Sequence, residues 1–118
     1  MELIFSACDI ISIHLPLTHK TNGLINAEFF KLMKSNGILI NYSRGGVVNE
    51  NDLCEFLAVN KFAGAAIDVF EYEPPQSSRL LNLANVIATP HIGGSTEESI
   101  LAMGQAAIDQ LVRKIDKS

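Results

Sequence analysis

A histidine stands between a proline and two glycines in the stretch TPHIGGST, residues 89–96. Glycine lets the backbone approach a ligand closely, and imidazole exchanges protons near neutral pH. A second candidate is Arg44, which follows the apolar run ILINYS (38–43) and precedes Gly45 and Gly46. Its guanidinium presents a planar fork of donors that fits a carboxylate or a phosphate. Together the two residues could orient an acidic substrate and move one of its protons.

Acidic residues close to these two leave more than one interpretation open. Glu73 follows the apolar run AGAAIDVF (63–70), and a carboxylate beside His91 would orient the imidazole and assist proton transfer. Alternatively, Glu73 could lie on the surface while backbone groups satisfy His91. Arg44 could likewise form a structural salt bridge in place of binding a ligand. The acidic residues that could pair with it are Glu50, Glu71 and Glu73.

Other polar residues lie within or beside apolar runs. Asp68 is near the end of AGAAIDVF, where a charge must be paired or must bind something. His14 ends a strand-like segment and could contact a ligand or be a satisfied core histidine. His19 lies in a polar loop and is expected in solvent. Tyr42 is expected to pack, with its hydroxyl reaching a polar partner.

The elements that position these residues alternate between apolar strands and amphipathic helices. Isoleucine-rich and alanine-rich runs predict strands at 9–15, 37–43, 63–70 and 85–90. Helical spacing predicts helices at 25–37 and 49–61, one turn at 80–84, and a long helix at 96–116. Asn26 would cap the first helix, and either Asn49 or Asn51 the second. Glu97 and Glu98 favour the start of the last helix.

This alternation indicates an α/β fold in which crossover helices join parallel strands. Ligands bind such sheets at the carboxyl ends of the strands. Polar, charged and glycine residues concentrate after the predicted strand ends, which argues for a site there. These residues are His14–Pro16, Ser43–Gly45, Asp68, Glu71, Glu73 and His91–Gly94.

Composition excludes several classes of protein. A chain of 118 residues with 47% hydrophobic residues suits one globular domain or part of a larger one. The net charge of -4 and the absence of a basic cluster argue against nucleic-acid binding. No apolar run approaches the ~20 residues of a membrane span. Cys8 and Cys54 lack the spacing of metal ligands, so we expect no metal site, reduced thiols and a cytoplasmic protein.

Three ordered motifs resemble the NAD-dependent D-2-hydroxyacid dehydrogenase family: INYSRGGVVNENDL, AGAAIDVFEYEPP and NVIATPHIGGSTEES. The similarity extends from about residue 3 to the end of the chain. The runs PHIGGSTEES and LCEFLAVNKFAGAAIDVF look most like the D-3-phosphoglycerate dehydrogenase branch, which opens serine biosynthesis. The resemblance implies a Rossmann-like domain, NAD as cofactor, a 2-hydroxy or 2-keto acid substrate, and a homo-oligomer.

The same resemblance implies a role for individual residues. Arg44 would hold the substrate carboxylate, His91 would exchange the hydroxyl proton, and Glu73 would pair with His91. Asp68 and the segment from His91 to Gly94 would lie beside the nicotinamide. The implied cofactor-binding residues are Leu15, Pro16, Ser43, Arg44, Asp68, His91, Gly93 and Gly94.

Parts of the family pattern are missing from this sequence. It contains neither a G-x-G-x-x-G turn nor the acidic residue about 20 positions later that together hold pyrophosphate and ribose, so NAD and NADP both remain possible. We therefore expect residues 1–118 to form the second half of a cofactor domain. Residues 96–118 would be a return helix towards an absent substrate domain. We expect weak or no NAD binding and an exposed sheet edge. Two alternatives are a non-catalytic NAD-sensing module resembling a corepressor, and an inert truncated remnant.

Overall fold

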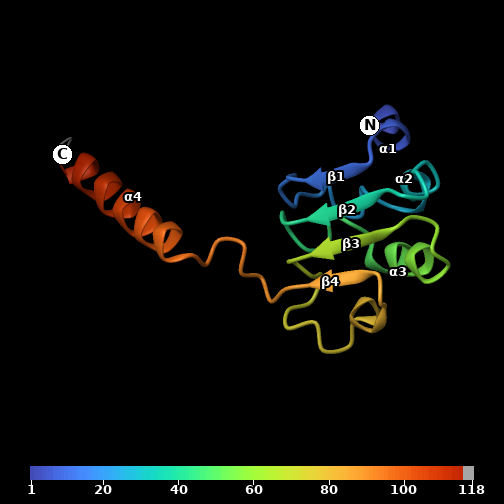
Figure 1. Ribbon diagram of the computed structural model, residues 1–118. Coiled ribbons are helices and arrows are strands. Elements are labelled where there is room, and N and C mark those ends of the chain that lie inside the picture. The colour runs from blue at the N-terminus through green and yellow to red at the C-terminus, as the bar shows by residue number, and fades with distance from the viewer. Residues whose placement is uncertain (116–118) are drawn as a thin grey trace.

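Four parallel strands form the frame of the computed structural model, which describes residues 1–115 (Figure 1). The strands are β1 (Ile10–Ile13), β2 (Ile38–Asn41), β3 (Gly64–Ile67) and β4 (Val86–Ala88). Each strand pairs with the next along the chain, in the order β1-β2-β3-β4. The predicted parallel sheet with crossover connections is therefore confirmed. Each strand is shorter than predicted, because residues beyond its ends leave the ladder to form loops.

Helices connect the strands and cover one face of the sheet. A short helix, α1 (Glu2–Ala7), precedes β1. The two crossover helices are α2 (Ala27–Phe30) and α3 (Glu50–Ala58), and a 3₁₀ turn, η1 (Arg79–Asn82), precedes β4. Both crossover helices lie on the same side of the sheet (Figure 1). The long helix α4 (Glu97–Ile115) follows β4.

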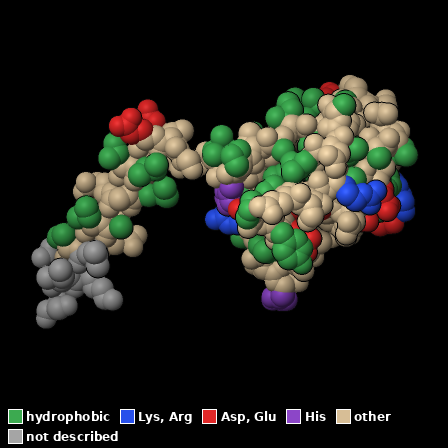
Figure 2. Space-filling view, turned by 90° about the horizontal axis from the view of Figure 1, so that it is seen from below, with side chains coloured by type: hydrophobic (Ala, Val, Ile, Leu, Met, Phe, Trp, Pro, Cys, Tyr) green, Lys and Arg blue, Asp and Glu red, His purple; other side chains and the backbone are tan. Residues whose placement is uncertain are grey.

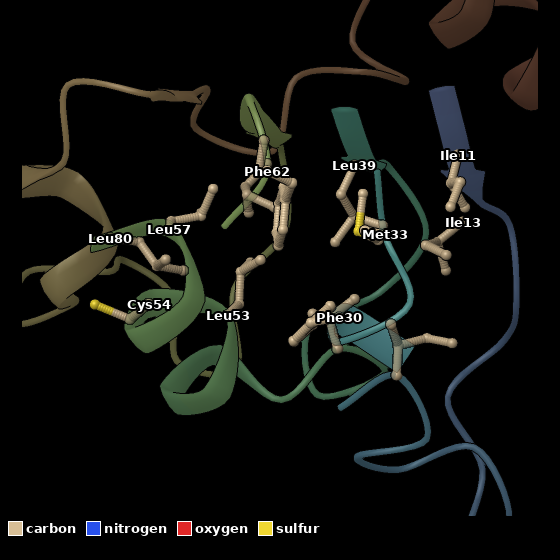
Figure 3. Close-up of a cluster of buried hydrophobic side chains, with 14 of the residues drawn as sticks. Ile11, Ile13, Phe30, Met33, Leu39, Leu53, Cys54, Leu57, Phe62 and Leu80 are labelled. Carbon is tan, nitrogen blue, oxygen red and sulfur yellow. The ribbon is translucent and has the colours of Figure 1, made fainter. Parts of the chain in front are cut away.

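The hydrophobic core fills the space between these helices and the sheet. Phe30 of α2 packs against Phe62 with ring centroids 5.9 Å apart, and Leu53 and Leu57 of α3 join the same cluster (Figure 3). Leu39 contributes from the middle of β2 and is fully buried. Burial of side chains of this size stabilises the fold by roughly 1.5–3 kcal/mol each. The core thus fixes the strands, and with them the loops that follow the strand ends.

The opposite face of the sheet is uncovered in the described part of the chain. Burial alternates along β1 and β2, and the outward side chains of Ile10, Ile38 and Ile87 are 61%, 38% and 70% exposed. The strands are therefore buried on one face among the 115 described residues. The apolar character of the outward positions is nevertheless that of a sheet built to be covered on both sides.

The first crossover helix is much shorter than the predicted helix at 25–37. Asn26 caps it as expected, because its side chain accepts a hydrogen bond from the Glu28 amide. After Phe30 the backbone tightens: the amides of Leu32 and Met33 donate to carbonyls three residues back, not four. These turns bury Met33 beneath the sheet. Tertiary packing of one apolar side chain therefore ends the helix earlier than its sequence suggests.

The N-terminus of α3 shows which of the two predicted residues caps the helix. The Asn49 side chain accepts a hydrogen bond from the Asp52 amide at 3.0 Å, whereas Asn51 is exposed within the first turn of the helix. We expect Asn49→Ala to lower the free energy of unfolding by about 1 kcal/mol. The matched variant Asn51→Ala should change it by no more than about 0.5 kcal/mol. Urea denaturation of both variants measures the difference, and equal effects would contradict this assignment.

Helix α4 extends away from the sheet. The Thr96 hydroxyl accepts a hydrogen bond from the Ser99 amide at its start, in agreement with the predicted N-terminus. Ile100, Met103 and Ile108 are exposed, and Figure 2 shows hydrophobic side chains along the surface of this helix. The predicted helix continues to residue 116, which lies outside the described residues. Within residues 1–115, no helix combines the length and the apolar character that a membrane crossing requires.

Candidate active site at the carboxyl edge of the sheet

His91 and Glu73 form a hydrogen-bonded pair beyond the ends of β4 and β3. The Nδ1 atom of His91 lies 2.8 Å from one carboxylate oxygen of Glu73, and the other oxygen accepts the Phe70 amide at 3.0 Å. These two hydrogen bonds, the one to His91 first, hold the pKa of Glu73 below its ordinary value. No described residue forms a hydrogen bond with Nε2 of His91, so this nitrogen is available to exchange a proton.

Asp68 anchors the loop that contains His91. Its carboxylate is only 2% exposed and accepts hydrogen bonds from the Thr89 hydroxyl and from the amides of Ile92 and Gly93, at 2.9 and 2.8 Å for the amides. These donors lie on both sides of His91, whose φ of 55° is in the left-handed region. A side chain on Gly93 would come within 2.9 Å of the same carboxylate. Asp68 therefore stabilises a backbone conformation that is uncommon for residues other than glycine.

Loss of the Asp68 charge should loosen this loop. Burial tends to raise the pKa of Asp68, but hydrogen bonds from Thr89, Ile92 and Gly93 outweigh it and leave the pKa below the ordinary value of 3.8. A depressed carboxyl pKa stabilises the fold above pH 3.8, and this stabilisation is lost as the pH falls through the folded value. We expect Asp68→Asn to cost about 2 kcal/mol, because one amide loses its charged acceptor. Amide NMR shifts of Ile92 and Gly93 should move in this variant; unchanged shifts would contradict the anchor.

The buried side chain of Asn41 shapes the turn that presents Arg44. At the end of β2, its carbonyl oxygen accepts hydrogen bonds from the Ser43 amide and hydroxyl, and its amide group donates to the Arg44 carbonyl at 3.3 Å. Asn41 was not predicted as a site residue, although its polar side chain inside the apolar run ILINYS was an available signal. The guanidinium of Arg44 donates to the Ser43 carbonyl at 2.6 Å. Among the described residues it forms no salt bridge.

Arg44 and His91 line the same cleft. The cleft has a volume of about 860 Å³ at the carboxyl edge of the sheet. Its lining residues are His14, Tyr42, Arg44, Asp68, Thr89, His91–Ser95 and Met103. A second hollow of about 610 Å³ shares His14, Tyr42 and Arg44 with it and adds Leu15–Leu17 and Ser43. The predicted catalytic and cofactor-binding residues therefore border these two adjoining hollows, except Glu73, which contacts the cleft through His91.

The remaining polar candidates have ordinary environments. His14 is exposed, with its Nε2 atom 2.7 Å from the Ser12 hydroxyl, so it is not a core histidine. His19 is exposed, as predicted. Tyr42 is 49% exposed, so the expectation that it packs is wrong: it follows β2 at the rim of the cleft. In the described part of the chain, no cluster of His, Cys, Asp and Glu could hold a metal ion.

The two hollows fit part of a dinucleotide cofactor. Leu15 and Pro16 provide an apolar wall on one side, and Gly94 has open space where a side chain would be. A flat, partly polar ring could therefore approach the backbone of the His91 loop closely. The pyrophosphate-binding glycine turn has no counterpart in the sequence. The two hollows therefore leave room for part of the cofactor, and residues 1–118 contain no glycine-rich turn to hold its pyrophosphate.

Several known proteins are similar to this chain in sequence and in fold. The family model described as D-isomer specific 2-hydroxyacid dehydrogenase, NAD binding domain, matches residues 1–93. The chain is 48% identical over 103 residues to D-3-phosphoglycerate dehydrogenase from Methanocaldococcus jannaschii, covering 87% of this chain and 20% of that protein. It is 39% identical to hydroxypyruvate reductase from Thermotoga maritima, covering 98% of this chain and 39% of the relative.

A solved structure supports the same assignment. The D-isomer specific 2-hydroxyacid dehydrogenase from Lactobacillus delbrueckii ssp. bulgaricus, in its NAD-complexed form, superposes with a TM-score of 0.87 and 27% identity. The match covers 99% of this chain and 40% of that one. The chain thus spans between a fifth and two fifths of the length of these three proteins. It belongs to the NAD-binding domain family of the D-isomer specific 2-hydroxyacid dehydrogenases.

Proposed function

We propose that this chain provides the acid/base residues of an enzyme that transfers a hydride between NAD and a 2-hydroxy acid. The observation that supports this most strongly is the hydrogen bond between His91 and Glu73, 2.8 Å long, beside a cleft that is also lined by Arg44. The Arg44 guanidinium forms no salt bridge with any residue that the structure describes. Oxidation of a 2-hydroxy acid requires two groups from the protein: one that moves a proton and one that binds the carboxylate.

The reaction assigns one task to each of these side chains. Arg44 binds the substrate carboxylate through its fork of donors and so orients the hydroxyl-bearing carbon. Nε2 of His91 accepts the hydroxyl proton, and Glu73 stabilises the resulting imidazolium through Nδ1. When bound, NAD would supply the hydride acceptor for the same carbon. Asp68 keeps the His91 loop in place throughout, while the residues lining the two hollows hold the ends of the cofactor.

For the substrate we propose 3-phosphoglycerate, at the opening step of serine biosynthesis. The support is that several similar relatives are named D-3-phosphoglycerate dehydrogenase, including the relative from Methanocaldococcus jannaschii. Relatives named hydroxypyruvate reductase and glyoxylate reductase share comparable identity, so other small 2-hydroxy acids are the competing substrates. We also propose that residues 1–118 form part of a cofactor domain, with 96–118 as the return helix, in a cytoplasmic homo-oligomer.

A chimera tests the proposed function. This chain would replace the matching segment of D-3-phosphoglycerate dehydrogenase from Methanocaldococcus jannaschii, and NAD reduction would be followed at 3-phosphoglycerate, glycerate and lactate. We expect turnover with at least one of these acids, and the highest kcat/KM with 3-phosphoglycerate. A folded chimera that binds NAD and turns over none of the three would contradict the assignment of His91. A preference for another acid would overturn only the choice of substrate.

Cofactor binding by the chain alone is expected to be weak or absent. The sequence lacks the glycine-rich turn that would hold the pyrophosphate, so most of the favourable phosphate contacts are missing. Calorimetric titration of NAD into the purified chain, beside the same titration into the chimera, measures the difference. Comparable affinity in the two proteins would show that this chain binds the phosphates by contacts other than the glycine turn.

A further inference from the structure

The peptide bond between Phe70 and Glu71 is contacted by the turn after β2 and by the first residue of α3. A side chain on Gly45 would overlap the Phe70 carbonyl and lie 2.7 Å from the Glu71 nitrogen, so the backbone after Arg44 lies directly against this peptide. The Glu71 amide donates a hydrogen bond to the carboxylate of Glu50, the first residue of α3. The hydrogen bond from Glu50 and the close approach of Gly45 thereby restrict the position of this peptide.

This peptide is adjacent to the hydrogen bonds that orient His91. The neighbouring amide, that of Phe70, donates to Glu73 at 3.0 Å, and the second oxygen of Glu73 contacts His91 at 2.8 Å. A continuous set of contacts therefore connects Glu50 to the imidazole through the Phe70–Glu71 peptide and the Glu73 carboxylate. Glu50 itself does not line the cleft that contains Arg44 and His91, and it has no part in the reaction described above.

We propose that Glu50 is a positioning residue: its hydrogen bond to the Glu71 amide fixes the loop so that Glu73 is held against His91. Glu50 lies 23 positions before Glu73 in the sequence, but helix α3 brings it beside the loop that contains Glu73. The catalytic meaning of this inference rests on the proposed function. The contact itself is a property of this chain and can be tested without cofactor or substrate.

The charge of Glu50 and its hydrogen bond act on Glu73 in opposite directions. Burial, and then the nearby carboxylates of Glu71 and Glu73, raise the pKa of Glu50 in spite of its hydrogen bond to the Glu71 amide. By the same repulsion, removal of the Glu50 charge alone would lower the pKa of Glu73. Removal of the hydrogen bond would free the loop, weaken the contacts of Glu73 with Phe70 and His91, and raise the pKa of Glu73.

The test uses two pairs of variants in the purified 118-residue chain, with the Glu73 carboxyl titrated by ¹³C NMR. Glu50→Gln and Glu50→Ala both lack the charge, but only glutamine can accept the Glu71 hydrogen bond. Native Glu50 and Glu50→Asp both have the charge, but aspartate is one methylene too short. We expect the pKa of Glu73 to be higher in Glu50→Ala than in Glu50→Gln. We also expect it to be higher in Glu50→Asp than in the native chain. Glu55→Ala, an exposed position on the same helix, is the matched control and should leave it unchanged.

The outcomes separate this inference from the proposed function. The positioning role is overturned if the pKa of Glu73 is the same in Glu50→Gln and Glu50→Ala, and is also the same in Glu50→Asp and the native chain. If Glu50→Ala does not fold, the comparison of Glu50→Asp with the native chain decides alone, because aspartate retains the favourable charge at the start of α3. Absence of turnover in the chimera would overturn the proposed function. It would not change the expected pKa differences of Glu73 in the chain alone.

Discussion

His91→Asn in the chimera is expected to lower kcat by ~10²–10⁴-fold, the usual effect of removing a positioned general acid/base. Asparagine adopts left-handed backbone conformations more readily than most residues, so it can keep the φ of 55° that His91 has in this loop. It cannot exchange a proton at the position of Nε2. Steady-state NAD reduction with the chimera's preferred acid measures the loss, and the melting temperature reports whether folding is intact.

His19→Asn is the matched control for this variant. His19 is exposed in the loop before Gly23 and lies outside both hollows, so its replacement should leave kcat within about twofold of the unsubstituted chimera. Glu73→Gln should lower kcat by a smaller factor than His91→Asn, because glutamine can still contact Nδ1 but does not stabilise the imidazolium by charge. Equal activity of His91→Asn and His19→Asn would exclude His91 as the acid/base.

Gly45→Ala should destabilise the chain by about 3 kcal/mol or more, which is a large fraction of the stability of a small domain. The added methyl group would overlap the Phe70 carbonyl, and this atom belongs to the backbone and cannot move aside by changing a rotamer. Relief of the overlap requires separation of the turn that presents Arg44 from the loop that presents Glu73. Denaturant unfolding of the purified chain measures the loss of stability.

Gly94→Ala is the appropriate comparison, because no atom lies within 4 Å of the position its methyl group would occupy. It should unfold within about 0.5 kcal/mol of the native chain. If Gly45→Ala were as stable as Gly94→Ala, the close approach between the two loops would not exist as described.

The sequence was sufficient to predict the parallel sheet, because isoleucine-rich and alanine-rich runs alternate with amphipathic segments. It also predicted the pair of His91 and Glu73, since both follow strand ends that a parallel sheet brings to one edge. Asn41 was missed although its side-chain hydrogen bonds are local, to Ser43 and Arg44. Glu50 was not predicted as a site residue, because its importance depends on a hydrogen bond to a loop 21 positions away in sequence. The early end of α2 was missed for a similar reason, since tertiary packing of Met33 overrides local helix propensity.

The left-handed conformation of His91 has a consequence for how this sequence changes over time. A non-glycine residue with such a φ costs roughly 1 kcal/mol, and the Asp68 hydrogen bonds offset that cost at the expense of a buried charge. Glycine or asparagine at position 91 would relieve the strain, so selection for stability alone favours loss of the histidine. The stability of this loop and the proton transfer proposed for it therefore impose opposing demands on one residue. A chain released from catalysis would be expected to lose His91 early, while the sheet beneath it persisted.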